Sequence, residues 1–309
     1  MKWSRQIPVS DGVVGVVDIG TNTIKFSLAR FEPPGAIQVI LTRAETVRLG
    51  YEIDKTGLVD PVRIERALQT LNEFSRLAND YGAVELFGVA TEALRSTSNG
   101  ALVLSRIRQE TGWDIEMISG DAEARLTFDG LRMVMQPTEN ALLVDIGGGS
   151  TEFVLAVDRT FQSAESLPVG SGRLADRFFS SDPPGLDAVL QTRGYALQAM
   201  RSLTVRPDAM AATLYLVGGN GMFLLSLCAH FGRGEQLDPA SLSILCGDVA
   251  SARSSEISAV LEIPVERARV LPAGAGIALA AVDKFRPAKI VATESGINRG
   301  LLVNRFGLD

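Results

Sequence analysis

Residues 141–156 read ALLVDIGGGSTEFVLA, and this stretch indicates the fold. Its first half is an apolar run typical of a strand that is buried on both faces. The run ends at Asp145, a glycine-rich turn follows at 147–150, and Glu152 begins a second strand-like stretch. Glycines let backbone N–H groups approach an anion closely, and a carboxylate at each end of the turn suits a divalent cation beside a phosphate. An ordinary tight hairpin is the alternative that this stretch leaves open.

The same pattern occurs a second time, in residues 13–29, VVGVVDIGTNTIKFSLA. Asp18 aligns with Asp145 with no gap between the two copies, and Lys25 stands where the later copy has Glu152. Two units of strand, Asp-Ile-Gly turn and strand, each opening about half of the chain, predict a duplicated α/β fold. We expect the two turns to face one another across a cleft and to bind one polyanionic ligand.

The composition is that of a soluble globular protein with room for two domains. The chain has 309 residues, of which 46% are hydrophobic and 21% charged. A formal net charge of −6 argues against broad binding to nucleic acid or to anionic membranes. The single histidine, His230, excludes mechanisms and metal sites that need two histidines. The two cysteines, Cys228 and Cys246, lack metal-ligand spacing and are expected as buried free thiols.

Two segments bear on the location of the protein. Residues 1–12 lack the apolar core of a signal peptide. The uncharged stretch 209–232 is long enough to suggest a membrane span, but its GGNG sequence at 218–221 divides it into a short strand and a helix from about Met222. We therefore expect a cytoplasmic protein with neither a membrane nor a nucleic acid as its partner.

Apolar periodicity predicts the main helices and several buried strands. The expected helices are 61–81, 121–135, 186–203, 241–261 and 265–285, and the expected strands include 84–90, 115–118 and 290–293. Pro272 is expected near a helix start.

A predicted loop after the strand 84–90 carries Thr91, Arg95 and Asn99. A guanidinium beside hydroxyl and amide groups suits bidentate binding of phosphate oxygens. A capped helix with a solvated arginine explains the same residues, and both interpretations stay open.

Glu123 lies in the first turn of a predicted helix, after Gly120. A carboxylate there can orient and deprotonate an attacking water, although a simple charge at a helix N-terminus is the commoner role. Two further glycine turns, 170–173 and 218–221, are typical of close approach to a ligand. The chain contains neither GxxxxGK[ST] nor GxGxxG, which excludes P-loop and Rossmann sites.

The motifs DIGTNT, ATEALRS, ISGDAEAR, VDIGGGSTE, GGNG and LPAGAG follow one another in this order. With them the chain resembles, from about residue 13 onward, the exopolyphosphatase/guanosine pentaphosphate phosphohydrolase family of the sugar kinase–Hsp70–actin superfamily. The resemblance implies two ribonuclease-H-like α/β domains with a central cleft, in a short two-domain form. We expect residues 1–124 and 296–309 to form one domain and residues 125–295 the other.

The resemblance also implies an activity and a site. The activity is hydrolysis of the terminal phosphoanhydride of inorganic polyphosphate, with Glu123 as general base. Mg²⁺, or another divalent cation, would be organised by Asp18, Asp145 and Glu152. Nine residues are expected to bind phosphate. The internal repeat assigns those of the first turn, Thr21, Asn22 and Thr23. The others are Arg95, Asn99, Gly147, Gly148, Gly149 and Ser150.

Three departures from the family pattern keep alternatives open. Ala122 replaces a second acid beside Glu123, Asn220 lies in a turn that is more usually Gly-Thr, and Asn298 lies in an altered C-terminal segment. Guanosine pentaphosphate is the alternative substrate. An ATP-dependent kinase and a catalytically weak nucleotide-binding sensor are the alternative classes. By analogy with the family, the apolar helices within 241–285 are expected to support a homodimer.

Overall fold

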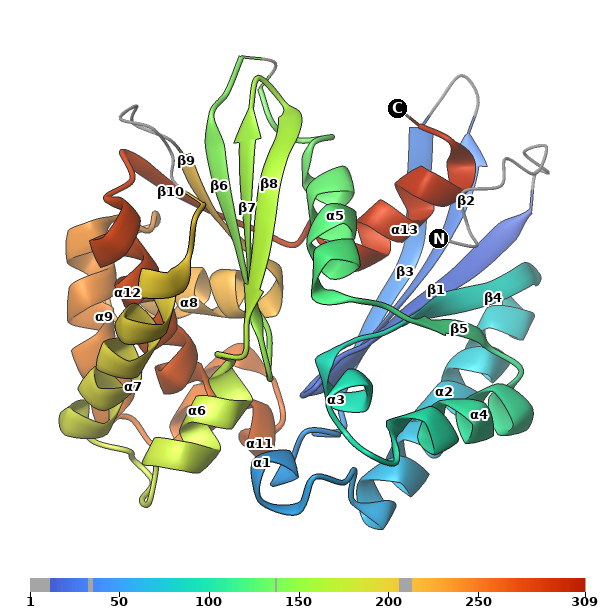
Figure 1. Ribbon diagram of the computed structural model, residues 1–309, viewed down its shortest axis with the longest axis horizontal. Helices are drawn as coiled ribbons and strands as arrows, with labels where there is room; N and C mark the ends of the chain where they lie inside the picture. Colours follow the sequence, from blue (N-terminus) through green and yellow to red (C-terminus); the bar gives the residue numbers. More distant parts are fainter. Residues whose placement is uncertain (1–11, 33–35, 137, 206–212, 309) are drawn as a thin grey trace. The chain divides into compact units, whose positions relative to one another are not determined.

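The computed structural model describes residues 12–32, 36–136, 138–205 and 213–308. The chain divides into two compact units, residues 1–133 with 295–309 and residues 134–294 (Figure 1). Residues 1–11, on which most of the argument about a signal peptide depends, lie outside the described residues.

The first unit contains a five-stranded sheet with the strand order β3-β2-β1-β4-β5. The neighbours β1–β2 and β2–β3 are antiparallel, and β1–β4 and β4–β5 are parallel. The elements of this unit are β1 (Val13–Ile19), β2 (Thr23–Glu32), β3 (Ala36–Thr46), α1 (Ile53–Thr56), α2 (Pro61–Asp80), β4 (Ala83–Ala90), α3 (Glu92–Arg95), α4 (Gly100–Thr111), β5 (Asp114–Met117), α5 (Gly120–Leu131) and α13 (Ile297–Phe306).

Helices cover both faces of this sheet, which explains the continuous apolar run of β1. Val17 points into a core that contains Leu71 of α2 and Ile107 of α4. Its neighbour Val16 points to the opposite face, into a core that contains Leu126 of α5 and Leu301 of α13. Because successive strand residues face opposite sides of a sheet, a strand buried on both sides needs apolar residues at every position.

The second unit contains another five-stranded sheet, with the order β8-β7-β6-β9-β10. Here β6–β7 and β7–β8 are antiparallel, and β6–β9 and β9–β10 are parallel. The elements of this unit are β6 (Ala141–Ile146), β7 (Thr151–Val157), β8 (Thr160–Leu167), α6 (Ser171–Phe178), α7 (Leu186–Ala199), the 3₁₀ helix η2 (Met200–Ser202), β9 (Thr213–Val217), α8 (Gly218–His230), α9 (Pro239–Ser251), α10 (Ser254–Leu261), α11 (Val265–Ala268), α12 (Leu271–Phe285) and β10 (Lys289–Thr293).

The two sheets have the same topology, strand for strand. The strand that carries Asp18 is central in the first sheet, and the strand that carries Asp145 is central in the second. The gapless repeat in the sequence is therefore a repeat of two ribonuclease-H-like folding units, and the predicted α/β class is confirmed.

Helix α12 is the buried centre of the second unit. Its residues from Leu271 to Val282 are all buried, and most of them are alanine or glycine. A Cβ atom added at Gly276 would lie 3.0 Å from the Val189 carbonyl oxygen of α7, so a larger residue would push these two helices apart. The thiols of Cys228 and Cys246 are free and buried, as predicted.

Several predictions about local structure are wrong. The residues 218–221 form the first turn of α8, so they do not make a separate turn before Met222. The predicted helix 241–261 is two helices, α9 and α10, with a break at residues 252–253. The predicted helix 265–285 is also divided, because Pro272 lacks an N–H and is tolerated only in the first turn of α12.

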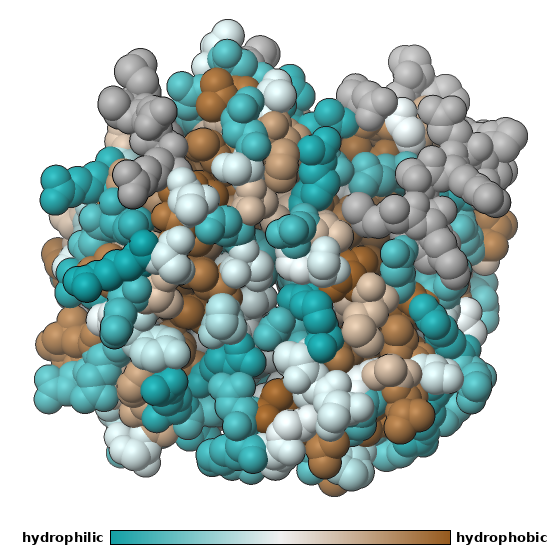
Figure 2. Space-filling model, in the orientation of Figure 1, coloured by the Kyte–Doolittle hydropathy of each residue, from teal (hydrophilic) through white to brown (hydrophobic). Residues whose placement is uncertain are grey.

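None of the helices in the described ranges combines the length and the apolar composition needed to cross a bilayer. On the face shown in Figure 2, hydrophobic side chains are scattered among hydrophilic ones. Scattered apolar side chains are the ordinary condition of a water-exposed surface.

Candidate functional site

The first candidate loop joins β1 to β2 and begins after Ile19, the residue that follows Asp18. Asp18 is buried and lies opposite Lys25 in the antiparallel pair, with Oδ2 3.9 Å from the lysine Nζ. The loop is closed by a hydrogen bond from the Gly20 N–H to the Thr23 carbonyl, 3.1 Å. The strand–turn–strand pattern therefore places the Asp18 carboxylate at the mouth of a tight turn.

The chain after β3 supports this loop from one side. The Gly50 N–H donates to the Thr21 carbonyl (2.9 Å), and the Arg48 N–H donates to the Asn22 carbonyl (2.8 Å). A Cβ atom at Gly50 would lie 2.0 Å from the Thr21 Cγ2, so a larger residue here would require the Thr21 side chain to move. Within the described ranges, the buried Asn22 Nδ2 and Thr23 Oγ1 have no hydrogen-bond partner. Both groups can donate a hydrogen bond to an anion.

Glu123 and Arg95 meet in the same unit. Arg95 ends the short helix α3, a helix where the sequence predicted a loop. Its Nη1 donates to the Ile118 carbonyl (2.6 Å) and to Glu123 Oε2 (3.3 Å), and its Nη2 donates to Glu92 Oε2 (2.9 Å). Glu123 is only 6% exposed. The structure therefore brings the predicted base and the predicted phosphate-binding arginine into contact.

Helix α5 begins at Gly120, three residues before Glu123. Ser119 is the N-cap and its side chain accepts from the Ala122 N–H. Glu123 then lies in the first turn, as predicted, where the positive end of the helix dipole favours a carboxylate.

Thr91 and Asn99 have structural partners. The Asn99 amide accepts from the Val59 N–H (2.9 Å) and donates to the Val59 carbonyl (3.0 Å). The buried Thr91 donates from its backbone N–H to the Ile19 carbonyl (3.2 Å). These contacts tie the segment after β4 to its neighbours, and the assignment of Asn99 to a phosphate stays a prediction.

The second candidate loop, 147–150, joins β6 to β7. Asp145 lies directly opposite Glu152 in the antiparallel pair, the position that Lys25 has opposite Asp18. Residues directly opposite one another have Cβ atoms about 4.5–5.5 Å apart, so these two carboxylates are neighbours on one face of the sheet. Both are buried, and Glu152 Oε1 accepts from Ser166 Oγ (2.7 Å).

The start of α6 lies against the glycines of this loop. The Gly147 N–H closes the loop by donating to the Ser150 carbonyl, 2.9 Å. A Cβ atom at Gly170 would lie 2.4 Å from the carbonyl carbon of Gly148. Residues 171–173, which were predicted to be part of a turn, are the first residues of α6, and the second loop rests on this helix start.

Sequence reasoning missed Arg267, on α11. Its guanidinium lies over the Phe223 ring, 5.5 Å from the centroid, and a Cβ atom at Gly219 would lie 3.3 Å from its Nη2. Burial lowers the pKa of Arg267 to about 10, and the negative charge of Asp145 acts against that shift. Arg267 therefore stays protonated at neutral pH, as a cation near Asp145. The only signal in the sequence is its position four residues before the LPAGAG motif.

Within the described residues, no group of three or more His, Cys, Asp or Glu side chains is arranged to hold a metal ion. Of the three predicted metal ligands, Asp145 and Glu152 lie together in the second unit, and Asp18 belongs to the first.

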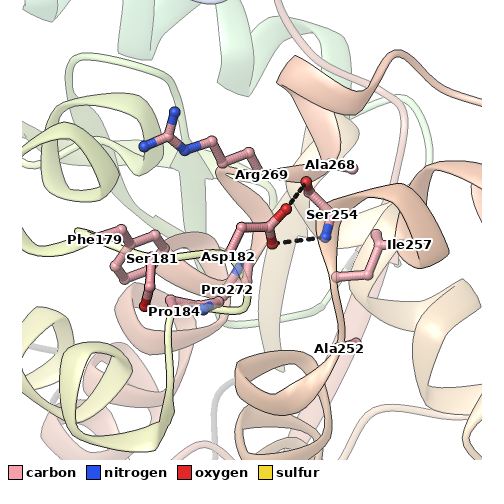
Figure 3. Close-up of a pocket in the computed structure, with 10 residues that line it drawn as sticks. All are labelled: Phe179, Ser181, Asp182, Pro184, Ala252, Ser254, Ile257, Ala268, Arg269 and Pro272. Carbon is pink, nitrogen blue, oxygen red and sulfur yellow. Dashed lines mark hydrogen bonds between the residues drawn. The ribbon is translucent and has the colours of Figure 1, made fainter.

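A pocket in the second unit lies beside the start of α10 (Figure 3). There the Asp182 carboxylate accepts from the backbone N–H (2.9 Å) and the hydroxyl (2.5 Å) of Ser254. This carboxylate caps α10 and joins the α6–α7 connection to it.

Comparison with known proteins agrees with this architecture. Exopolyphosphatase 1 of Mycobacterium tuberculosis is 35% identical over 207 residues, which cover 65% of this chain and 60% of that protein. Exopolyphosphatase 1 of Mycobacterium leprae is 28% identical over 304 residues, which cover 95% of this chain and 89% of that protein. The solved structure of the Aquifex aeolicus PPX-GPPA enzyme superposes with a TM-score of 0.74 at 27% identity, covering 94% of this chain and 99% of the other.

A family model describes most of the chain. The model of the Ppx/GppA phosphatase family matches residues 30–307, which include α3, α5 and the whole second loop. The chain belongs to the Ppx/GppA phosphatase family.

Proposed function

We propose that this protein is an exopolyphosphatase that hydrolyses the terminal phosphoanhydride of inorganic polyphosphate and releases orthophosphate. The observation that carries the proposal is the second loop, where the neighbouring carboxylates Asp145 and Glu152 adjoin glycines 147–149. Family membership and the names of the mycobacterial relatives support the same activity.

Each unit carries one loop that is proposed to bind phosphate. In the first loop, Asn22 Nδ2 and Thr23 Oγ1 are the buried donors that lack partners within the described ranges. In the second loop, the amides of Gly148, Gly149 and Ser150 are the proposed donors. Positively charged Arg267 adds to the attraction for a polyanion.

The donor set at the second loop fits a divalent cation. Mg²⁺ is commonly bound by one or two carboxylates together with waters and substrate phosphates, and Asp145 and Glu152 provide such a pair. The assignment of Asp18, in the first unit, as a metal ligand stays a prediction. When bound, the ion supplies charge neutralisation for the phosphate oxygens.

Glu123 is proposed as the general base. Its carboxylate is buried and held by Arg95, and a base in a fixed position can accept the proton of an attacking water. Water attacks the terminal phosphorus, the bridging P–O bond breaks, and the shortened polyphosphate leaves with its negative charge. A positioned base contributes roughly 10²–10⁴-fold to the rate, and positioning and electrostatics contribute the rest.

The decisive experiment measures orthophosphate release from three substrates side by side: short polyphosphate, long polyphosphate and guanosine pentaphosphate. Each reaction is run with Mg²⁺ and with excess EDTA. We expect Mg²⁺-dependent release from polyphosphate without any acceptor molecule. Release from guanosine pentaphosphate alone would replace the proposed substrate, and no release from any of the three would contradict the proposed activity. Self-association and a cytoplasmic location stay predictions, and light scattering tests the first.

A further inference from the structure

Four consecutive carbonyl groups, those of residues 146–149, are held by side chains and amides that follow the loop in sequence. Asn220 Nδ2 donates to the Ile146 carbonyl. Ser171 donates to the Gly147 carbonyl from its N–H (2.9 Å) and from its hydroxyl (3.1 Å). Arg173 donates to the next two carbonyls, from its N–H to Gly148 (3.0 Å) and from Nη1 to Gly149 (2.9 Å).

The direction of these carbonyls fixes the direction of the loop amides. In a trans peptide the N–H points opposite to the C=O of the same peptide unit. Because the carbonyls of residues 147–149 point toward the start of α6, the N–H groups of Gly148, Gly149 and Ser150 point away from it. In the part of the chain that the structure describes, none of these three N–H groups donates to a backbone carbonyl of another loop or turn. A row of successive N–H groups of this kind is suited to an anion.

Two of these carbonyls are held by a side chain, that of Ile146 at the end of β6 and that of Gly149 within the loop. The Gly149 carbonyl is held by the Arg173 guanidinium, whereas the Gly148 carbonyl is held by a backbone N–H. In the first loop, the corresponding bonds to the Thr21 and Asn22 carbonyls all come from backbone N–H groups. Since a glycine backbone has several accessible conformations of similar energy, the Gly149–Ser150 peptide can rotate once its side-chain anchor is removed.

We infer that Arg173 is a positioning residue, whose guanidinium holds the Gly149 carbonyl so that the Ser150 N–H is directed at a phosphate. The inference rests on the proposed function, because it assigns the phosphate to the substrate chain. Arg173 acts through the loop and does not need to touch the phosphate itself. This role explains the glycine-and-arginine turn at 170–173.

The test compares Arg173→Ala and Arg173→Lys with Arg177→Ala as the matched control. Arg177 lies one turn further along α6, where its guanidinium lies over the rings of Phe178 (5.5 Å) and Tyr195 (4.5 Å). Two readouts need no turnover: the affinity for orthophosphate, by calorimetry, and the protection from hydrogen exchange that orthophosphate gives to residues 147–151. The third readout is kcat and KM with polyphosphate.

We expect Arg173→Ala to weaken orthophosphate binding about tenfold or more, since a hydrogen bond from a charged group is lost. Ligand-induced protection of residues 147–151 should be lost, and KM for polyphosphate should rise. Arg173→Lys, which keeps a cationic donor, should lie between Ala and the wild type. Arg177→Ala should keep the wild-type affinity and protection.

Unchanged phosphate affinity and protection in Arg173→Ala would overturn the inference. Equal losses in Arg177→Ala would also overturn it, because they would indicate general loosening of α6. A wild-type protein that hydrolyses no phosphoanhydride would refute the proposed function. Selective loss of phosphate binding in Arg173→Ala would still support the role of Arg173 in that case.

Discussion

Arg95 Nη1 lies 3.3 Å from Glu123 Oε2, so a guanidinium contacts one of the two carboxylate oxygens of the proposed general base. The same nitrogen donates to the carbonyl of Ile118, which lies between β5 and α5. Arg95 thus fixes both the carboxylate and the chain that precedes its helix. A base held in this way keeps one orientation, which general-base catalysis requires.

Because Arg95 acts on Glu123, their substitutions should not be additive. We expect Glu123→Gln to lower kcat for polyphosphate at least 100-fold, in line with removal of a general base. Arg95→Met should lower it less, and the double variant should equal Glu123→Gln alone, since residues that act as a unit share one effect. Steady-state kinetics and circular dichroism of the four proteins make the comparison.

The control for this cycle is Asp121→Asn, which removes an exposed carboxylate from the same helical turn. It should leave kcat nearly unchanged. Multiplicative losses in the double variant would show that Arg95 and Glu123 act independently.

Asp145 and Glu152 should bind the divalent cation together. We expect Asp145→Asn and Glu152→Gln each to weaken the binding of Mn²⁺, used as a spectroscopic substitute for Mg²⁺, by about tenfold or more, because each removes one of two adjacent hard oxygen ligands. Electron paramagnetic resonance counts free Mn²⁺ without the need for turnover. Asp187→Asn, on the exposed start of α7, is the control. Wild-type Mn²⁺ affinity in both site variants would exclude this pair as the ion's ligands.

Helix α5 depends on a glycine of α13 for its position. A Cβ atom at Gly300 would lie 1.9 Å from the Leu126 carbonyl oxygen, so the two helices must separate to admit it. We expect Gly300→Ala to lower the free energy of unfolding by roughly 1–3 kcal/mol, in the range of overpacked cores. Gly194→Ala, in the exposed part of α7 with no atom within 4 Å, should raise it by about 0.5–1 kcal/mol. Urea denaturation measures both, and equal effects would refute the packing argument.

A buried tyrosine makes the stability of the second unit depend on pH. Tyr215 Oη donates to Glu139 Oε2 at 2.7 Å. Burial alone would raise the pKa of Glu139, but hydrogen bonds from Thr213, Tyr215 and the Gln136 N–H, with the charge of Lys289, outweigh it and lower the pKa below 4.5. Since the folded state favours the charged form, Glu139 stabilises the protein above its ordinary pKa. This stabilisation is lost as the pH falls through the lowered value.

The variant Tyr215→Phe tests this dependence of stability on pH. We expect it to destabilise the protein by roughly 1 kcal/mol near neutral pH. The difference from the wild type should shrink as the pH falls below 4.5, the ordinary pKa of the Glu139 side chain. Tyr195→Phe, whose ring lies beside Arg177, supplies the same chemical change without the carboxylate partner. Urea denaturation midpoints are measured at several pH values. The same pH dependence of the midpoint in both variants would contradict the argument.

Local patterns were enough to predict the duplicated α/β fold. The apolar run before Asp145 and its gapless counterpart before Asp18 require central strands, because only a strand covered on both faces is apolar at every position. The same patterns identify the two loops, since the Asp-Ile-Gly turns and their neighbours are contiguous in sequence. They also place Glu123 in the first turn of a helix, three residues after Gly120.

Contacts between distant segments were beyond the reach of the sequence. The pairing of Arg95 with Glu123 spans 28 residues, and the support of the 147–150 loop by Arg173 spans 24. Arg267 lies close enough to Asp145 for its charge to act, although the two residues are far apart in the sequence. The direction of a loop carbonyl depends on which later segment donates to it, and periodicity and spacing carry no information about that choice. Folding of the chain therefore settles how the loop amides and the base are held.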